Sequence, residues 1–269
     1  MSRCVRVRRL FRYPVKGFTG EDCDRLDVLP GGRIAGDRVL GLRFDDEKAE
    51  DDAWSSKAGF LALVHTPVLA ALRLRFDAET PKIRLAHGND VLFDDVLDDT
   101  GRRRFASTVE RFLSSVQDPS VAAIARRFPL RLAGNGKTPR FQDREPGFVT
   151  LHGRPSIAAV ATAVDEDAEV TERRFRSNIV IDGLEAWDEQ RWVGGTVRIG
   201  DVAFDVVNPV TRCLATHANP DSGQRDRAMM QELLHVFPAA RPTLGVLMTS
   251  ERGGVVRVGD DVRVAGVVQ

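Results

Sequence analysis

Cysteine is scarce in this sequence, with only three among 269 residues. Cys4, Cys23 and Cys213 are far apart, and no C-x-x-C pair occurs. An odd and scattered set of this kind supplies neither a disulfide framework nor a zinc knuckle. We therefore expect a cytoplasmic protein in a reducing compartment.

Long apolar runs are also missing. No window approaches about 18 continuous apolar residues, the length that a membrane-spanning helix needs. The opening residues 1–9 (MSRCVRVRR) contain no apolar region of the kind that signal peptides carry. These absences predict a chain that stays where it is made and has no membrane partner.

Neither sign of charge predominates. The 39 Lys and Arg residues balance 39 Asp and Glu residues, so no net field attracts a polyanion, and no nucleic-acid partner is expected. Hydrophobic residues, by contrast, make up 42% of the chain, which is enough for a buried core. The length favours a soluble globular protein of two modest domains.

Several catalytic fingerprints are missing as well. Gly136-Lys137-Thr138 is like the end of a phosphate-binding loop, but Arg131 stands where that loop needs its first glycine. Pro139 also interrupts the helix that would have to follow. The sequence contains no G-x-G-x-x-G after a strand, no G-x-S-x-G and no H-E-x-x-H. Nucleotide, dinucleotide, hydrolase and zinc chemistries all become less plausible.

Alternating apolar residues predict half-buried antiparallel strands. In the first half they occur at residues 5–7, 40–44, 72–76 and 83–85. Near the C-terminus, residues 197–204 and 256–264 each place a Gly-Asp pair between two short alternating runs, which predicts two tight hairpins. The second half is therefore expected to be largely β.

Three helices are predicted from apolar residues at helical spacing. The first begins at Ser107, because Ser107-x-x-Glu110 has the form of a capping box. A second helix ends at Pro129, and a third spans residues 226–237. The methionines at 229–230 are interpreted as core-filling side chains, since methionine at helical spacing usually fills space.

Cys213 is the strongest candidate for chemistry. It follows the predicted strand 202–206 and precedes a loop of turn residues, a position where side chains meet clefts rather than core. Arg212 beside it and His217 nearby favour the thiolate, which attacks electrophiles and binds soft metals. By composition alone, however, a lone cysteine is more often structural.

Four stretches resemble segments of one family, in the family's order. They are Tyr13-Pro14-Val15-Lys16-Gly17, Gly36-Asp37-Arg38, Arg174-Phe175-Arg176-Ser177-Asn178-Ile179-Val180-Ile181, and Arg212-Cys213 followed by Asn219-Pro220-Asp221-Ser222-Gly223. They resemble the Y-P-[VI]-K-S, G-D-R, R-F-R-P-N-I-V-I and R-C-x5-D-P-x-[TS]-G segments of the MOSC domain and of the β-barrel domain that precedes it. The MOSC domain is found in molybdenum cofactor sulfurases and amidoxime-reducing proteins.

The resemblance implies a fold. It predicts a mixed α+β protein, mainly β, with two β-barrel-like domains, a few flanking helices and a cofactor cleft between the domains. The turn-rich residues 134–139 place the seam, so the predicted domains are 1–140, which includes the helices near 107–128, and 141–269, the MOSC domain.

The resemblance also implies a molybdenum cofactor, Mo-molybdopterin, with Cys213 as metal ligand and catalytic residue. Lys16, Arg38 and Arg176 would hold the pterin phosphate, which needs several charge-assisted donors from different segments. Further expected cofactor contacts are Asn178, Arg212 and Ser156, with His152 as a neighbour.

Three positions depart from the family pattern. Asn219 stands where family members usually carry Asp, and an Asn can cap the loop but cannot act as a carboxylate base. Ser177 replaces a proline, and Gly17 replaces a serine.

Two function classes follow. The first is a molybdenum-dependent oxidoreductase, a reductase of N-hydroxylated or similar small substrates. Because no cysteine follows Cys213, this enzyme would take electrons from a separate flavin, haem or iron-sulfur protein. The alternative is a non-catalytic carrier of the molybdenum cofactor, or of sulfur held as a persulfide on Cys213.

Overall fold

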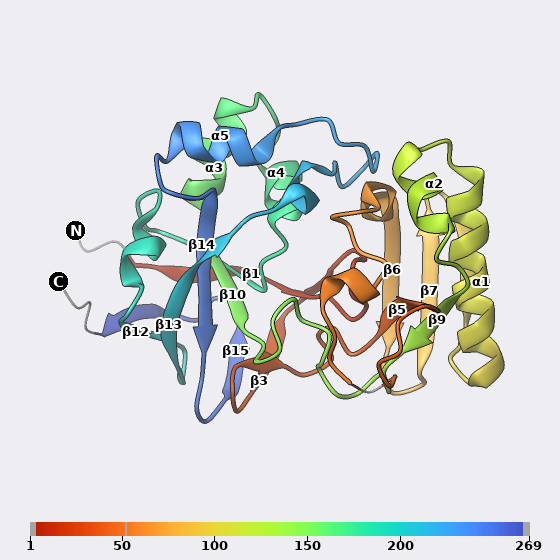
Figure 1. Cartoon of the computed structure of the whole chain (residues 1–269). Helices are drawn as coiled ribbons and strands as arrows, with labels where there is room; N and C mark the ends of the chain where they lie inside the picture. Colours follow the sequence, from red (N-terminus) through yellow and green to blue (C-terminus); the bar gives the residue numbers. More distant parts are fainter. Residues whose placement is uncertain (1–3, 52, 266–269) are drawn as a thin grey trace.

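The computed structural model describes residues 4–51 and 53–265 (Figure 1). The opening segment, residues 1–9, was predicted to contain no signal peptide. Residues 1–3 of this segment lie outside the described residues. The helices are α1 (Asp99–Ser115), α2 (Pro119–Ala125), α3 (Arg154–Ala163), α4 (Ala168–Phe175) and α5 (Met229–Val236). Short 3-10 helices are η1 (Lys57–Gly59), η2 (Pro67–Ala71), η3 (Asp188–Trp192) and η4 (Leu214–His217).

Strands make up most of the elements. They are β1 (Arg6–Arg12), β2 (Glu21–Cys23), β3 (Arg25–Leu29), β4 (Arg33–Ile34), β5 (Gly41–Phe44), β6 (Leu72–Asp77), β7 (Lys82–His87), β8 (Asp90–Val96), β9 (Leu130–Ala133), β10 (Val149–Gly153), β11 (Ile179–Asp182), β12 (Thr196–Ile199), β13 (Val202–Thr211), β14 (Thr243–Thr249), β15 (Gly254–Arg257) and β16 (Val262–Ala265). The predicted mixed and mainly β fold is confirmed.

One large sheet organises the molecule, with the strand order β16-β12-β13-β14-β10-β11-β1-β2. Strands β10 and β11 are parallel, and the crossover that a parallel pair requires is supplied by α3 and α4. This crossover ends at Phe175, so the chain turns at Arg176 before it enters β11. Helices α3, α4 and α5 lie together beside the sheet (Figure 1).

The expected barrels are not seen among the described residues. The large sheet ends at β16 on one side and β2 on the other, and no pairing joins these two end strands. The remaining strands form three small sheets, β15-β3-β4, β5-β9 and β6-β7-β8. The described residues therefore form open sheets.

One of the two predicted hairpins is confirmed. Strands β12 and β13 pair antiparallel around Gly200 and Asp201. The hairpin predicted over residues 256–264 is wrong, because β15 pairs with β3 whereas β16 pairs with β12. The backbone between them bonds instead to the N-terminal strand, where Gly259 N donates to Val7 O at 2.9 Å.

The predicted helices exist, but the start of the first was placed too late. Helix α1 begins after Asp98, whose carboxylate accepts a hydrogen bond from Gly101 N at 2.7 Å, and Ser107 lies inside the helix. Met229 is fully buried, as expected of a core-filling side chain. Helices α3 and α4 were not predicted.

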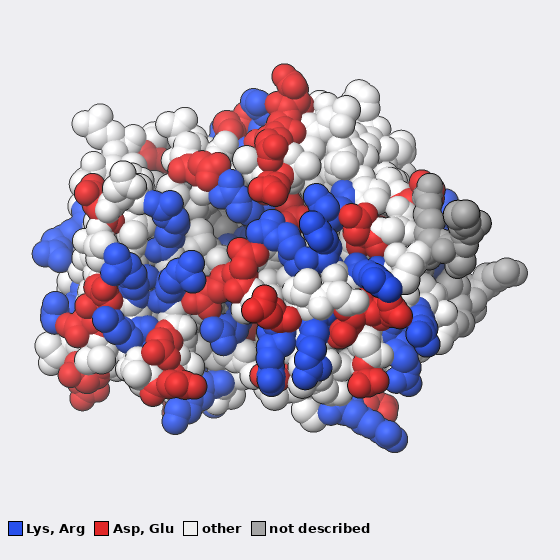
Figure 2. All heavy atoms as spheres, turned by 180° about the vertical axis from the view of Figure 1, so that it is seen from behind, with Lys and Arg blue, Asp and Glu red and all other residues white. Residues whose placement is uncertain are grey.

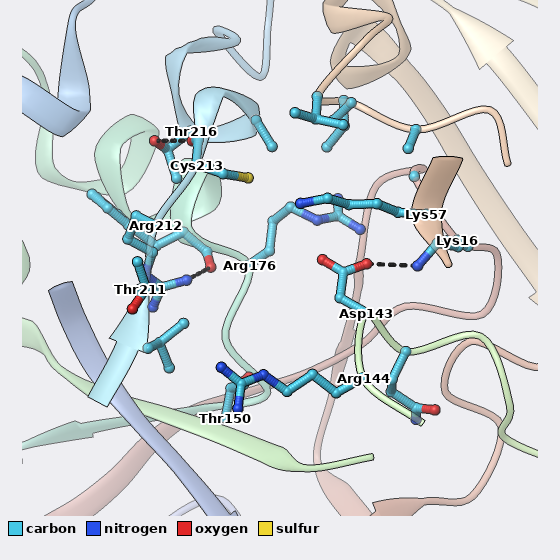
Figure 3. Close-up of a pocket in the computed structure, with 18 of the residues that line it drawn as sticks. Lys16, Lys57, Asp143, Arg144, Thr150, Arg176, Thr211, Arg212, Cys213 and Thr216 are labelled. Carbon is cyan, nitrogen blue, oxygen red and sulfur yellow. Dashed lines mark hydrogen bonds and ion pairs between the residues drawn. The ribbon is translucent and has the colours of Figure 1, made fainter. Parts of the chain in front are cut away.

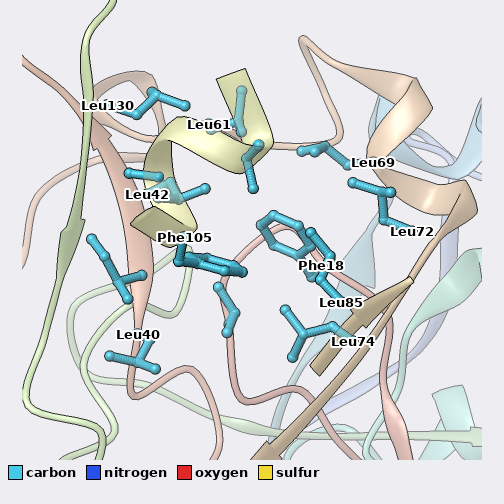
Figure 4. Close-up of a cluster of buried hydrophobic side chains, with 14 of the residues drawn as sticks. Phe18, Leu40, Leu42, Leu61, Leu69, Leu72, Leu74, Leu85, Phe105 and Leu130 are labelled. Carbon is cyan, nitrogen blue, oxygen red and sulfur yellow. The ribbon is translucent and has the colours of Figure 1, made fainter. Parts of the chain in front are cut away.

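Two main hydrophobic clusters form the core. One is built around α1 and the strands of the first half, and its members include Phe18, Leu74 and Phe105 (Figure 4). The other fills the large sheet and mixes Val7 and Leu10 of β1 with residues from β10 to β16. The first residues of the chain thus contribute to the core of the second half. The boundary near residue 140 stays a prediction.

Among the five α-helices that the described residues form, none has the length and apolar character needed to span a membrane.

Candidate functional site

A cavity of about 240 Å³ is lined by residues from both halves of the chain (Figure 3). Five of the predicted site residues line it, namely Lys16, Arg38, Arg176, Arg212 and Cys213. They come from segments more than a hundred residues apart in sequence, and the fold brings them together. Asn178 and Ser156 are not among the lining residues.

Cys213 enters the cavity from the end of β13. Its carbonyl oxygen accepts hydrogen bonds from both the backbone N and the Oγ1 of Thr216, each at 3.0 Å, which fixes the start of η4. The side chain is partly exposed, and Figure 3 shows its sulfur pointing into the cavity. The predicted position of the thiol, between a strand and a loop, is confirmed.

Arg212 lies behind the cysteine and is buried. Its Nη1 donates to Phe175 O at 2.6 Å, and its Nε donates to Leu244 O at 3.0 Å. Burial lowers its pKa to about 10, so the guanidinium remains charged at neutral pH. Because its hydrogen bonds go to backbone carbonyls, Arg212 holds α4, β14 and the cysteine loop together.

Arg38 and Arg176 share an unusual backbone conformation. Their φ angles are 50° and 55°, in the left-handed region that non-glycine residues rarely adopt. Such strain is found at ligand sites where the surrounding structure over-determines the backbone. Both guanidinium groups lie over the ring of Tyr13, at 4.9 Å for Arg38 and 4.4 Å for Arg176. Tyr13 therefore sets the positions of two cationic side chains.

Each of these arginines has one further anchor. Arg38 forms an ion pair with Asp37, which also accepts a hydrogen bond from Tyr13 N at 2.8 Å. Arg176 Nη1 donates to Phe18 O at 2.6 Å. Burial, followed by the nearby Arg38 charge, lowers the pKa of Arg176 to about 10, although Tyr13 and Asp37 oppose the shift. Both groups keep donors available for an anion.

Lys16 and Asp143 form an ion pair at the wall of the cavity. Lys16 is only 4% exposed, and its Nζ lies 2.6 Å from Asp143 Oδ1 and 2.8 Å from Phe141 O. Burial lowers the pKa of Lys16, against the charge of Asp143. Partial desolvation would raise the pKa of Asp143, but Lys16 and Arg38 hold it at about 2. The Asp143 side chain is 67% exposed, and its carboxylate is ionised at neutral pH.

The cavity has a surplus of positive charge. Its lining contains seven basic side chains, Lys16, Arg38, Lys57, Arg144, Arg174, Arg176 and Arg212, and a single carboxylate, that of Asp143. Arg174 is neutralised by ion pairs with Glu166 and Asp226. Lys57 forms no ion pair with any residue that the structure describes. An anionic ligand would complement this lining.

Gln142 adds an unsatisfied amide to the lining. It is only 6% exposed, and neither Nε2 nor Oε1 has a hydrogen-bond partner among the described residues. A buried amide without partners is costly, and a ligand with donors and acceptors along one edge would satisfy it. A soft thiol, converging cations and an unpartnered amide together fit a phosphate-bearing heterocycle with a thiophilic metal.

The two predicted contacts that do not line the cavity have structural partners. Asn178 Oδ1 accepts from Thr150 Oγ1 at 3.0 Å, and its Nδ2 donates to Asp37 Oδ1 at 3.3 Å. Ser156 Oγ donates to Glu189 Oε2 at 2.9 Å. Asn178 thus acts through Asp37 on Arg38, whereas Ser156 links the first turn of α3 to η3.

His152 is buried behind the site, and neither ring nitrogen has a hydrogen-bond partner among the described residues. Its Nε2 lies 4.0 Å from Glu172 Oε2. Burial lowers its pKa, so the ring is neutral at pH 7. His152 does not line the cavity.

The structure explains two departures from the family pattern. Asn219 caps its loop, because its Oδ1 accepts from Asp221 N at 2.8 Å and from Ser222 N at 3.2 Å. Gly17 has a φ of +86°, and a Cβ atom there would lie 2.9 Å from Leu61 O. The glycine is therefore required by the backbone.

Sequence reasoning missed Lys57, Gln142, Asp143 and Arg144. Lys57 begins the three-residue 3-10 helix η1, which is too short to show a periodic pattern. The other three follow the turn-rich residues 134–139 and belong to no predicted helix or strand, so their sequence gives no local signal of burial. Tyr13 lies in the family-like segment 13–17, but nothing in the sequence indicates that two guanidinium groups pack on its ring.

The other cysteines lie elsewhere. Cys4 is exposed, with its Sγ 3.5 Å from Asp261 Oδ1. Burial raises the pKa of Cys23, with smaller contributions from Glu21 and Asp22. Burial rather than the neighbouring carboxylates is the main cause of this shift in the pKa of Cys23.

Comparison with known proteins finds a match to a known family in the second half. Residues 146–263 match the MOSC domain. Mitochondrial amidoxime-reducing component 1 of Mus musculus is 34% identical over 110 residues, covering 37% of this chain and 32% of that protein. The Homo sapiens protein of the same name is 31% identical over 136 residues, covering 47% and 39%.

A molybdenum cofactor sulfurase of Caenorhabditis briggsae is 30% identical over 137 residues, covering 50% of this chain and 19% of that protein. The matches thus span well under half the length of these curated relatives. The resemblance to MOSC-domain proteins predicted from the motifs is confirmed.

Proposed function

We propose that this protein is a molybdenum-cofactor-dependent oxidoreductase that reduces N-hydroxylated or similar small substrates. The observation that carries the proposal is a partly exposed thiol, Cys213, that points into a cavity whose lining has a surplus of positive charge. The MOSC match and the relatives named amidoxime-reducing components support the same reading. Electrons would come from a separate donor protein.

Different residues of the cavity would bind different parts of the cofactor. Arg38, Arg176 and Lys16 would hold the terminal phosphate, and Gln142 would read a polar edge of the pterin. Cys213 would bind the metal through its thiolate, a soft donor. When bound, the cofactor supplies a two-electron redox change.

Other side chains of the cavity would position the cysteine loop and bind the substrate. Arg212 keeps the cysteine loop in place through its carbonyl partners. Asp143 stays ionised, so it can accept a hydrogen bond from an O–H or N–H group of a substrate. Lys16 and Asp143 partly neutralise each other within the cavity wall, whereas Arg176, Lys57 and Arg144 form no ion pair with a described residue and add to the attraction of an anion.

The proposal is tested with protein purified from a host that makes the cofactor. We expect about one molybdenum and one pterin per chain, measured by metal analysis and by pterin fluorescence after oxidation. Reduced methyl viologen should then support reduction of benzamidoxime. Molybdenum-free protein, beside a control molybdoenzyme from the same host that is loaded, would contradict the proposal.

The carrier alternative has its own signature. It predicts bound cofactor or a persulfide on Cys213 without turnover, and the relative named molybdenum cofactor sulfurase gives it some support. Loaded protein that reduces no hydroxylamine or amidoxime with any small donor, and that carries a persulfide by mass spectrometry, would favour the carrier.

A further inference from the structure

A second and larger cavity, of about 850 Å³, adjoins the first. The two cavities share four lining residues, Leu63, Arg174, Arg176 and Ala215. Its lining comes from β1, β2, β6 and β7 and from α4 and the loop after Cys213. Its volume lies within the range of sites that hold small organic molecules, about 300–1,000 Å³.

Arginines on one sheet face line this cavity. Arg73 and Arg75 are exposed residues of β6, and Leu74 between them is buried in the core. Arg84 of β7 lies directly opposite Arg75 in the antiparallel register. Like charges in directly opposite positions destabilise a sheet. Arg84 is also opposite Asp94 of β8, its ion-pair partner, whereas Arg75 pairs with no carboxylate among the described residues; an anion bound between the two guanidinium groups would offset their repulsion.

The carboxylates of the cavity already have partners. Glu21 pairs with Arg12 at 2.9 Å, and Asp22 pairs with Arg9 at 2.8 Å. Asp221 pairs with Arg173, with both of its oxygens at 2.8 Å. None of the three carboxylates neutralises the arginines of β6 and β7.

The arginines of the sheet face are less completely satisfied. Arg84 pairs with Asp94 at 2.6 Å, and Arg73 donates to Gly88 O. The side chain of Arg75 forms no hydrogen bond or ion pair with any part of the chain that the structure describes. The sheet face therefore presents at least one uncompensated guanidinium group to the cavity.

We propose that this second cavity binds an anionic group, phosphate or carboxylate, that is part of the substrate. A molecule that extends past Arg176 and Ala215 would place its N-hydroxylated end toward Cys213 and its anionic end at Arg75 and Arg84. This inference rests on the proposed function and adds a substrate class to it, N-hydroxylated compounds that carry an acidic group. Arg75 and Arg84 are then specificity-determining residues.

The test compares benzamidoxime with its 4-carboxy and 4-phosphonomethyl derivatives, using reduced methyl viologen. The wild type should show a KM about tenfold lower for the anionic probes, the effect of one charged hydrogen bond. Combining Arg75→Gln and Arg84→Gln should raise the ratio of anionic to neutral KM by about tenfold. Arg198→Gln, an exposed strand arginine outside both cavities, is the matched control and should leave the ratio unchanged.

A binding measurement separates this inference from the proposed function. Calorimetric titration of the 4-phosphonomethyl probe needs no turnover, and we expect binding that the double substitution weakens about tenfold or more. Binding of this kind without turnover of any probe would contradict the proposed function and leave the anion site standing. Equal KM ratios in the wild type and the double variant would overturn the site. Inorganic phosphate that binds as tightly as the probe would overturn the substrate assignment.

The melting temperatures of the Arg75 and Arg84 variants show whether the substitutions affect folding. Arg75 has no ion pair to lose among the described residues, so Arg75→Gln should leave the melting temperature unchanged or raise it. Arg84→Gln also removes the solvent-exposed pair with Asp94, which should cost little. A loss of binding together with an unchanged melting temperature therefore reports on the site and not on the fold.

Discussion

The ring of Tyr13 links the two cationic groups at the back of the cavity. Burial raises the pKa of its phenol, so the hydroxyl stays protonated and donates to Ser177 O at 3.1 Å. Arg38 and Arg176 pack on its faces while their backbones adopt the left-handed conformation. The position of each guanidinium group therefore depends on one aromatic side chain as well as on its own anchor, the Asp37 ion pair for Arg38 and the Phe18 carbonyl for Arg176.

Lys57 offers the cleanest test of the anion site, because its removal breaks no ion pair among the described residues. We expect Lys57→Ala to lower pterin occupancy without lowering the melting temperature.

Arg176→Ala should cost about 1.5–3 kcal/mol of cofactor affinity, the value of a charged hydrogen bond. Pterin fluorescence after oxidation measures occupancy, with Arg198→Ala as the control. Equal occupancy in all variants would exclude a phosphate at these side chains.

Substitution of Lys16 or Arg38 differs from substitution of Lys57 or Arg176, because Lys16 and Arg38 each form an ion pair with a carboxylate. Arg38→Ala would leave the buried Asp37 without its ion pair, so fold stability should fall together with occupancy. A loss of pterin occupancy in Lys16 or Arg38 variants therefore reports on the phosphate site only if Lys57→Ala and Arg176→Ala lose occupancy as well.

The Lys16–Asp143 pair predicts a pH dependence. The pKa of Asp143 is depressed to about 2 in the folded protein, below its ordinary value of about 3.9. Its contribution to stability is therefore complete above about pH 4 and is lost as the pH falls toward about 2. The free energy of unfolding of wild type minus that of Asp143→Asn should shrink over this window. A difference that grows on acidification would contradict the ion pair.

Helix α1 shows how a convincing local pattern can be misplaced. Ser107 and Glu110 have capping-box spacing, yet Asp98 caps the helix nine residues earlier. The turns between them contain Arg102, Arg103 and Arg104, which have good helix propensity but no apolar stripe. Periodicity therefore located the buried part of the helix and missed its exposed beginning.

Substitution distinguishes the two proposed starts of α1. Asp98→Ala removes the hydrogen bond to Gly101 N and should cost about 1 kcal/mol of stability. Ser107→Ala lies on the exposed side inside the helix and should change stability by less than about 0.5 kcal/mol. Chemical denaturation of the two variants measures the difference. A larger loss for Ser107→Ala would place the helix start where the sequence pattern did.

Long-range pairing explains the errors in the strands. Residues 256–264 have the local form of a hairpin, but β1 bonds to the turn through Val7, and β15 pairs with β3 instead. Nothing within the segment encodes partners that lie more than 200 residues away. The β12–β13 hairpin was predictable because all of its hydrogen bonds are local.

Figure 2 shows basic and acidic side chains mixed over the face seen from behind, in keeping with the equal numbers of the two. Anion preference in this molecule must therefore come from local surpluses such as those of the two cavities. The motifs were sufficient to identify Lys16, Arg38, Arg176 and Cys213 as neighbours. Asp143 and Gln142 could not be predicted, because their roles depend on tertiary contacts.

The assignment of Cys213 as the metal ligand is tested most directly by X-ray absorption at the molybdenum edge. Wild type and Cys213→Ser are compared after loading in the same host, with Cys23→Ser as the matched control. A hydroxyl is a harder donor and a poor substitute for a thiolate, so the variant should lose one sulfur neighbour of molybdenum together with reductive activity. Cys23→Ser should keep both. An unchanged molybdenum spectrum in Cys213→Ser would contradict the assignment.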